Sequence, residues 1–115
     1  MKKKVNELEL HQIDYFVAKA EKIRLYFDSD NKRCLFLNED YSLHCMYSPT
    51  TNPSQAWPII EREKISIKPS SRFKDEWFAE IITNLFSGQH GMSSLEAAMR
   101  CYVAIKFGEE VDINV

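Results

Sequence analysis

The sequence predicts an α+β fold, with a mostly antiparallel sheet of about five short strands and three helices. Three observations lead to this prediction. Apolar residues recur at helical spacing near both ends of the chain. Runs of strand-forming residues, separated by polar turns, lie between them. The length of 115 residues, with 44% hydrophobic and 28% charged residues, suits a single domain over residues 1–115 with its own core.

The first helix is predicted over residues 7–22. Leu10 and Ile13 begin an apolar stripe at helical spacing, which continues toward the end of this stretch. Asn6 and Glu9 have the spacing of a capping box, so they mark the predicted start of the helix.

The last helix has the strongest pattern in the chain. Ser93 and Glu96 have capping-box spacing at its start, and Gly108 suits its C-terminal end. Between them, apolar residues cover most of the helix circumference, so this helix is expected to be largely buried. Glu96 and Arg100 form a favourable pair four residues apart.

Strands are predicted where β-branched, aromatic and aliphatic residues form short runs. These runs are residues 23–27, 33–37, 41–47, 64–68 and 76–83. The first two flank a polar stretch and predict a hairpin. In the third, Tyr41, Leu43, Cys45 and Tyr47 alternate with other residues and predict one apolar face. Residues 84–92 contain two of the three glycines and are predicted to be a loop, and the tail 109–115 is predicted to run extended.

A middle helix is predicted after Asn52, which is a good N-cap and is followed by Pro53 at the first helical position. Gln55 stands where a capping box would place a side chain that reaches back to the cap. Pro58 conflicts with a regular helix, because it donates no N–H and crowds the carbonyl of Ser54. Either the helix kinks at Pro58, or a short turn ends there and a new helix begins.

Two stretches, YSPTTNPSQAWPIIERE and LEAAMRCYVAIKFGEEVDI, resemble the NinX-like phage proteins, a family with no assigned chemistry. Asn52 stands where that family has Asp, and Ala56-Trp57 replaces a pair of glycines. The chain also resembles the phage ABA sandwich domain, which implies a sheet with helices packed on both faces. The resemblance further implies a phage or prophage origin and a location in the bacterial host cell.

Several function classes are not expected. A formal charge of −2 argues against an electrostatic nucleic-acid binder. No run is long enough for a membrane span and no signal peptide is recognisable, so a cytoplasmic protein is expected. His44 and Cys45 are neighbours that would point to opposite faces of a strand, and no other spacing suggests a metal site. No catalytic residues, enzyme activity or cofactor are predicted, because no nucleophile lies near a positioned base.

The best candidate binding residues lie where a strand end, a polar turn and a helix N-terminus meet, which together offer free backbone donors to an anion. These residues are Tyr47, Ser48, Thr50, Thr51, Trp57 and Arg62. The simpler interpretation is that the aromatic residues belong to the core and the polar residues turn the chain and cap the helix. We favour it, because capping explains most of these residue types.

Three functions follow as hypotheses. The first is a non-enzymatic phage accessory protein that binds a host or phage protein, and a homodimer is one route to a larger binding surface. The second is a binder of a small anionic ligand, such as a nucleotide, in the region from Tyr47 to Arg62. The third is single-stranded nucleic-acid binding through exposed aromatic residues and the basic N-terminus.

Overall fold

The computed structural model describes residues 1–113, apart from the side chains of His44, Leu85 and Phe86. Its helices are η1 (Val5–Glu7, a 3-10 helix), α1 (Leu10–Ala20), α2 (Pro53–Glu63) and α3 (Ser94–Phe107). Its strands are β1 (Lys2–Lys4), β2 (Leu25–Asp28), β3 (Arg33–Leu37), β4 (Leu43–Met46), β5 (Ser66–Pro69), β6 (Trp77–Ile81), β7 (Asn84–Gly91) and β8 (Glu110–Asp112). The predicted α+β class is therefore confirmed. The predictions for the side chain of His44 and for the last two residues of the tail lie outside the described residues.

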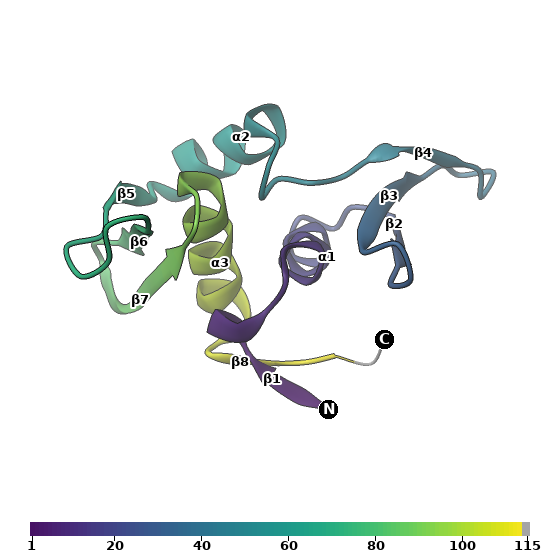
Figure 1. Ribbon diagram of the computed structural model, residues 1–115. Helices are drawn as coiled ribbons and strands as arrows, with labels where there is room; N and C mark the ends of the chain where they lie inside the picture. Colours follow the sequence, from purple (N-terminus) through teal and green to yellow (C-terminus); the bar gives the residue numbers. More distant parts are fainter. Residues whose placement is uncertain (114–115) are drawn as a thin grey trace.

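Helix α3 is the centre of the fold. In Figure 1 it stands between α1 and the sheet formed by β5, β6 and β7. All residues from Ala97 to Val103 are buried, as expected for a helix that is apolar over most of its circumference. The Ser93 side chain accepts a hydrogen bond from the Glu96 N–H at 3.1 Å, and Gly108 ends the helix with a φ of 91°. The predicted last helix is confirmed at both ends.

The strands of the described residues form three small antiparallel sheets rather than one. The sheet β2-β3-β4 packs against α1 at one end of the molecule, and the sheet β5-β6-β7 packs against α3 at the other (Figure 1). The third sheet pairs the two ends of the chain, with Lys3 opposite Val111. The tail through Asp112 is extended, as predicted. The resemblance to the ABA sandwich domain stays a prediction.

Strand β7 corrects the prediction of a loop over residues 84–92. Its two glycines fit close contacts instead of marking a loop. A Cβ on Gly88 would lie 2.6 Å from the ring of Phe78 on the neighbouring strand. A Cβ on Gly91 would lie 2.5 Å from the backbone nitrogen of Ala97 in α3. Glycine here lets β7 approach a ring on one side and a helix on the other, and such long-range reasons leave no local signal.

The Gly91→Ala substitution is expected to destabilise the protein by about 1 to 3 kcal/mol, because the added methyl group meets helix backbone that cannot move aside. Gly88→Ala is the matched control, since the Phe78 ring can rotate away and its cost is expected to be smaller. Urea unfolding of both variants measures the difference. Equal stability of the two variants would contradict this explanation of the β7–α3 contact.

Helix α1 is shorter than predicted. Its N-cap is Glu9, whose side chain and that of Gln12 form the capping box, so the predicted pair of Asn6 and Glu9 is wrong. Asn6 instead lies in η1, and Leu8 is buried between the two helices. The helix ends at Ala20, and Lys22 has a φ of 58°, which is incompatible with a continuing helix.

Helix α2 continues through Pro58 as one element. Pro58 is exposed, so the Ser54 carbonyl that it deprives of a partner lies on the solvent side. The N-cap is Asn52, whose side chain accepts the Ser54 N–H at 2.9 Å, as expected. Gln55 does not reach back to the cap. Its Oε1 accepts the Ser48 N–H at 2.7 Å and its Nε2 donates to the Met46 carbonyl, so it fastens the helix to the end of β4.

Candidate functional site

The segment between β4 and α2 is a closed turn. The Ser48 carbonyl accepts hydrogen bonds from the N–H groups of Thr51 and Asn52, at 2.9 and 2.8 Å. The Tyr47 side chain is 3% exposed and its ring lies edge-on to Phe36. Burial raises the pKa of the Tyr47 hydroxyl. The backbone N–H groups of Thr51 and Asn52, which an anionic ligand would need, are therefore already hydrogen-bonded within the turn.

Thr50 is fixed by a long-range contact with helix α1. Asp14 accepts the Thr50 N–H at 2.9 Å with one oxygen and the Thr50 hydroxyl at 3.0 Å with the other. Both residues are buried, since 1% of Thr50 and 4% of Asp14 is exposed. Burial raises the pKa of Asp14 to about 7, although the hydrogen bonds from Thr50 oppose that shift. This buried carboxyl joins the turn to α1.

Arg62 is held by carboxylates. Its guanidinium donates to both oxygens of Glu21, at 3.0 and 2.6 Å, and to Glu63 at 2.8 Å. The Tyr102 hydroxyl makes a hydrogen bond to the same Glu21 carboxylate. The hydrogen bond from Arg62 lowers the pKa of Glu21, and burial raises the pKa of the Tyr102 hydroxyl. A ligand phosphate near Arg62 would have to compete with two carboxylates.

The six candidate residues thus divide among three environments. Tyr47 and Thr50 are in the core, Ser48 and Thr51 form the turn, and Trp57 and Arg62 lie on the surface of α2. Trp57 is 50% exposed, and its Nε1 donates to Glu61 one turn further along the helix at 2.9 Å. Each of the six has a contact within the fold. Ligand binding by these residues stays a prediction.

A different surface was missed in the sequence. Tyr26, Leu35 and Met46 are paired across β2, β3 and β4, and they point away from α1. Tyr26 and Met46 are 46% and 48% exposed, whereas Leu35, which lies between them, is buried, with 7% of its surface exposed. Leu37 and Leu43 form the next pair on this face. We call these five residues the outer face of the sheet.

A β-bulge explains why the outer face was missed. The pairing shifts between Leu35 and Leu37, so that Leu43 and Met46, three residues apart, both pair on this face. Strict alternation had instead predicted one apolar face for Tyr41, Leu43, Cys45 and Tyr47. Tyr47 is buried, but Tyr41, Leu43 and Cys45 are exposed, so most of that predicted face is not buried. The bulge depends on the partner strand and leaves no signal within residues 41–47.

The described cysteine and histidine side chains offer no reactive or metal-binding group. Cys34 and Cys101 are buried thiols and Cys45 is exposed. Burial raises the pKa of Cys34 to about 12 and that of Cys101 to about 11, which disfavours the reactive thiolates. His11 is buried and stacks on the Phe27 ring. Within the part of the chain that the structure describes, His, Cys, Asp and Glu side chains form no group of three or more that could hold a metal ion.

Most of the chain matches a known protein family. A protein-family model described as "Bacteriophage P22, NinX" matches residues 4–106. A search of curated proteins finds no match. Among the described residues, no helix combines the length and the apolar character needed to cross a bilayer.

Proposed function

Because the chain belongs to the phage NinX family, we propose that it is a non-enzymatic accessory protein that docks onto a host or phage protein through the outer face of the β2-β3-β4 sheet. The observation that carries this proposal is the set of exposed apolar side chains Tyr26, Leu43 and Met46, which lie around the buried Leu35 on this face. Large exposed apolar side chains that gather on one sheet face are typical of binding surfaces.

Polar groups border the outer face. At the turn between β2 and β3, Arg33 and Asp28 form an ion pair at 3.0 Å. Near the start of β4, the Arg24 guanidinium lies 5.1 Å from the centre of the exposed Tyr41 ring. An apolar centre with a rim of polar and aromatic residues is the usual composition of a protein–protein interface.

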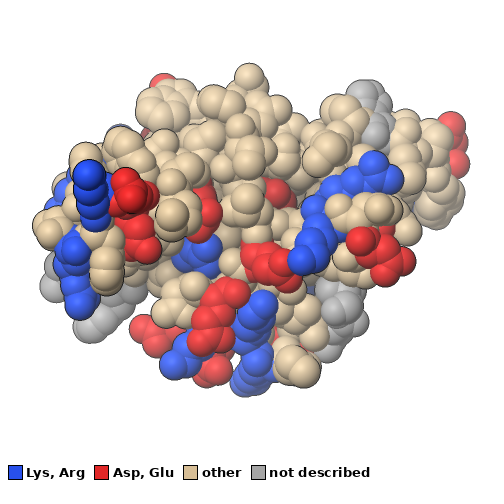
Figure 2. Space-filling view, viewed as in Figure 1, with Lys and Arg blue, Asp and Glu red and all other residues tan. Residues whose placement is uncertain are grey.

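The charge distribution supports a protein partner over a nucleic acid. Figure 2 shows acidic and basic side chains interspersed on the face that it presents. A nucleic-acid surface would gather positive charge, because phosphate contacts supply most of its affinity. The non-enzymatic part of the proposal is supported by the buried thiols of Cys34 and Cys101, which are poor nucleophiles.

The test is capture of a partner by a double variant, Tyr26→Lys with Met46→Lys. Ile82→Lys is the matched control, because Ile82 is an apolar residue, 75% exposed, in the turn between β6 and β7. From phage-infected cells, the wild type and the control are expected to capture the same partner, and the double variant to lose it by at least about tenfold. Equal capture by all three proteins would overturn the proposal.

A second copy of this chain is a separate outcome of the same design. Sedimentation of the purified wild type and both variants distinguishes it. A dimer that only the double variant disrupts would identify the outer face as a self-association surface instead of a docking site for another protein.

A further inference from the structure

The β5-β6-β7 sheet has a row of large side chains on the face that points away from α3. Lys68 pairs with Phe78 and Phe78 pairs with His90, so each strand contributes one residue to the row. Ala79, the next residue of β6, is buried in the core, and alternation places Phe78 on the opposite face. The row therefore lies at the other end of the molecule from the β2-β3-β4 sheet (Figure 1).

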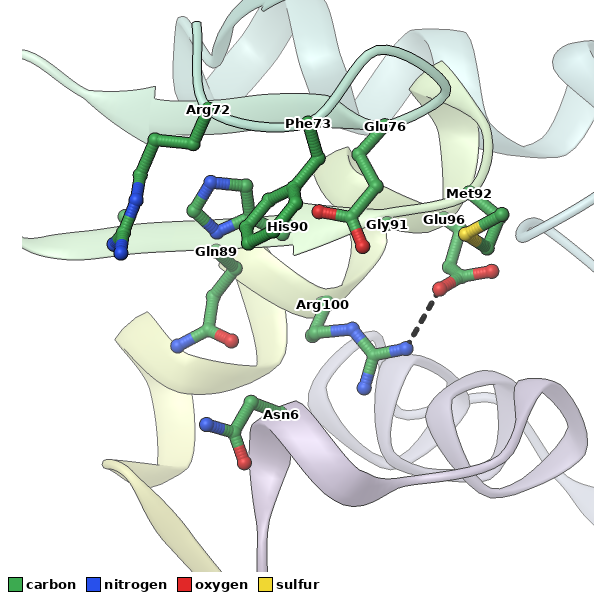
Figure 3. A pocket seen from close by; sticks show the side chains of 11 residues that line it. Asn6, Arg72, Phe73, Glu76, Gln89, His90, Gly91, Met92, Glu96 and Arg100 are labelled. Carbon is green, nitrogen blue, oxygen red and sulfur yellow. Dashed lines mark hydrogen bonds and ion pairs between the residues drawn. The ribbon is translucent and has the colours of Figure 1, made fainter. Parts of the chain in front are cut away.

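Three aromatic rings are in contact on this surface. The ring centres of Phe78 and His90 are 4.9 Å apart, and those of His90 and Phe73 are 6.5 Å apart. Figure 3 shows the Phe73 and His90 rings next to each other, at one edge of a neighbouring cavity. Phe73 is 52% exposed. Gly88 leaves room for the Phe78 ring to lie across β7, since a Cβ there would be 2.6 Å from it. We call these three rings the aromatic platform.

Two cations lie beside the aromatic platform. The Lys68 Nζ is 5.5 Å from the centre of the Phe78 ring, and the Arg72 guanidinium is 5.7 Å from that of Phe73. The Lys68 side chain is 61% exposed, and Arg72 is also exposed. The Lys68 Nζ is 3.7 Å from the Glu80 carboxylate, and an exposed pair at this distance is weak. Both cations can therefore turn toward an anion.

A surface cavity of about 260 Å³ lies between these cations and the aromatic platform. It is lined by Lys68, Ser71, Arg72, Phe78 and His90. Among the described residues, the lining thus combines two cations, a hydroxyl and two rings, and it includes no carboxylate. In Figure 3, Arg72 is on the left of the view, and the carboxylates of Glu76 and Glu96 are on the right. This lining is complementary to an anion that is attached to a flat ring.

We propose that the aromatic platform binds single-stranded nucleic acid. A phosphate lies in the cavity, where Lys68 and Arg72 bind it, and neighbouring bases stack on the rings. Because the platform continues past the cavity to Phe73, it has room for more than one base. A duplex does not suit it, since paired bases are already stacked on one another. Every base has a π face, so no base preference is expected.

Stacking supplies most of the affinity in this proposal. The formal charge of −2 and the interspersed charges in Figure 2 allow only a small electrostatic contribution from the chain as a whole. Two cations at the platform are enough to hold the strand in place while the bases stack. The site does not depend on the outer face of the β2-β3-β4 sheet, so the failure of one proposal leaves the other standing.

The test is a fluorescence anisotropy titration of a labelled oligothymidylate of about ten nucleotides with the full chain. The logarithm of the association constant is expected to fall with the logarithm of the salt concentration with a slope of about −1.4, because each phosphate contact contributes about −0.7. Unlabelled thymidine monophosphate is expected to compete at least about tenfold less well than the unlabelled oligonucleotide, since it offers a single base. A duplex of the same length should also compete less well.

Two matched double variants locate the site. Phe73→Ala with Arg72→Gln removes an exposed ring and its cation, and it is expected to weaken binding about tenfold or more. Tyr41→Ala with Arg24→Gln is the control, because this pair has a similar contact, at 5.1 Å, in the region between β3 and β4. It makes the same change in charge and should bind like the wild type. All four residues are exposed, so both variants should melt like the wild type.

Three results would overturn the proposal. The first is equal binding by the wild type and both double variants, which would place the contacts elsewhere on the chain. The second is competition by thymidine monophosphate as strong as that by the oligonucleotide, which would mean a site for one phosphate instead of a strand. The third is no binding at low salt with about 0.1 mM protein, a concentration at which even non-specific nucleic-acid binders associate.

Discussion

Replacing Arg100 by methionine is expected to lower the free energy of unfolding by about 3 to 5 kcal/mol. Arg100 connects the last helix to the start of the chain, since its Nη1 donates to the carbonyls of Val5 and Leu8. Methionine fills similar volume but removes the donor of the Leu8 carbonyl and one of the two donors of the Val5 carbonyl, which keeps the Leu8 N–H at 3.2 Å. It also leaves the Glu96 carboxylate, of which 14% is exposed, without its cation. Most of the lost stability therefore comes from the buried partners that no longer have Arg100 as a donor.

Urea unfolding measures this loss, and a matched substitution on the same helix controls for it. Lys106→Met removes an exposed cation whose nearest carboxylate, Glu63, is 3.8 Å away, and it is expected to cost less than about 1 kcal/mol. The double variant Glu96→Gln with Arg100→Met should recover part of the loss, because it removes the stranded charge. An Arg100→Met protein as stable as the control would contradict the anchoring role.

Ionisation of the Asp14 carboxyl is expected to lower the free energy of unfolding as the pH rises from about 4 to about 7. Its pKa is raised from 3.8 to about 7 in the folded protein, so the folded state binds the proton more tightly than the unfolded state. The stabilising effect of protonation is complete below the unfolded value and is lost as the pH approaches the folded value. This effect amounts to about 4 kcal/mol at most.

Asp14→Asn should remove this dependence. The asparagine oxygen can accept the Thr50 N–H and its amide can donate to the Thr50 hydroxyl, so the contact with the turn is kept. The variant is expected to be more stable than the wild type above pH 7. Unfolding of both proteins by urea from pH 4 to 8 gives the difference, in which groups such as Glu21, with its lowered pKa, cancel. A constant difference across this range would rule out titration of Asp14.

Local patterns in the sequence were sufficient for the elements whose ends depend on nearby residues. Ser93 and Gly108 bound the last helix as predicted, and Asn52 caps the middle one, because a cap satisfies backbone groups within a few residues. The same rule misplaced the start of α1. There Glu9 and Gln12 form the capping box, a variation that the usual Ser, Thr, Asn and Asp preferences do not anticipate.

Long-range contacts account for what the sequence did not reveal. Strand β7 contains glycines because the Phe78 ring and the α3 backbone approach them. The outer face depends on a bulge set by the pairing of β3 with β4. In the candidate segment, the partner of Thr50 is Asp14, 36 residues earlier. Elsewhere, Asn6 of η1, Gln89 of β7 and Arg100 of α3 come together to line one cavity. None of these partners follows from residue type or spacing.

Photo-crosslinking in phage-infected cells tests the docking role of the outer face. A photoreactive phenylalanine analogue replaces Met46 in one protein and Ile82 in another. Both positions are exposed and apolar, but Met46 is in β4 and Ile82 is in the turn between β6 and β7. The proposed function predicts a discrete crosslinked species from position 46 and none from position 82. A crosslink from position 82 with none from position 46 would contradict docking through the outer face.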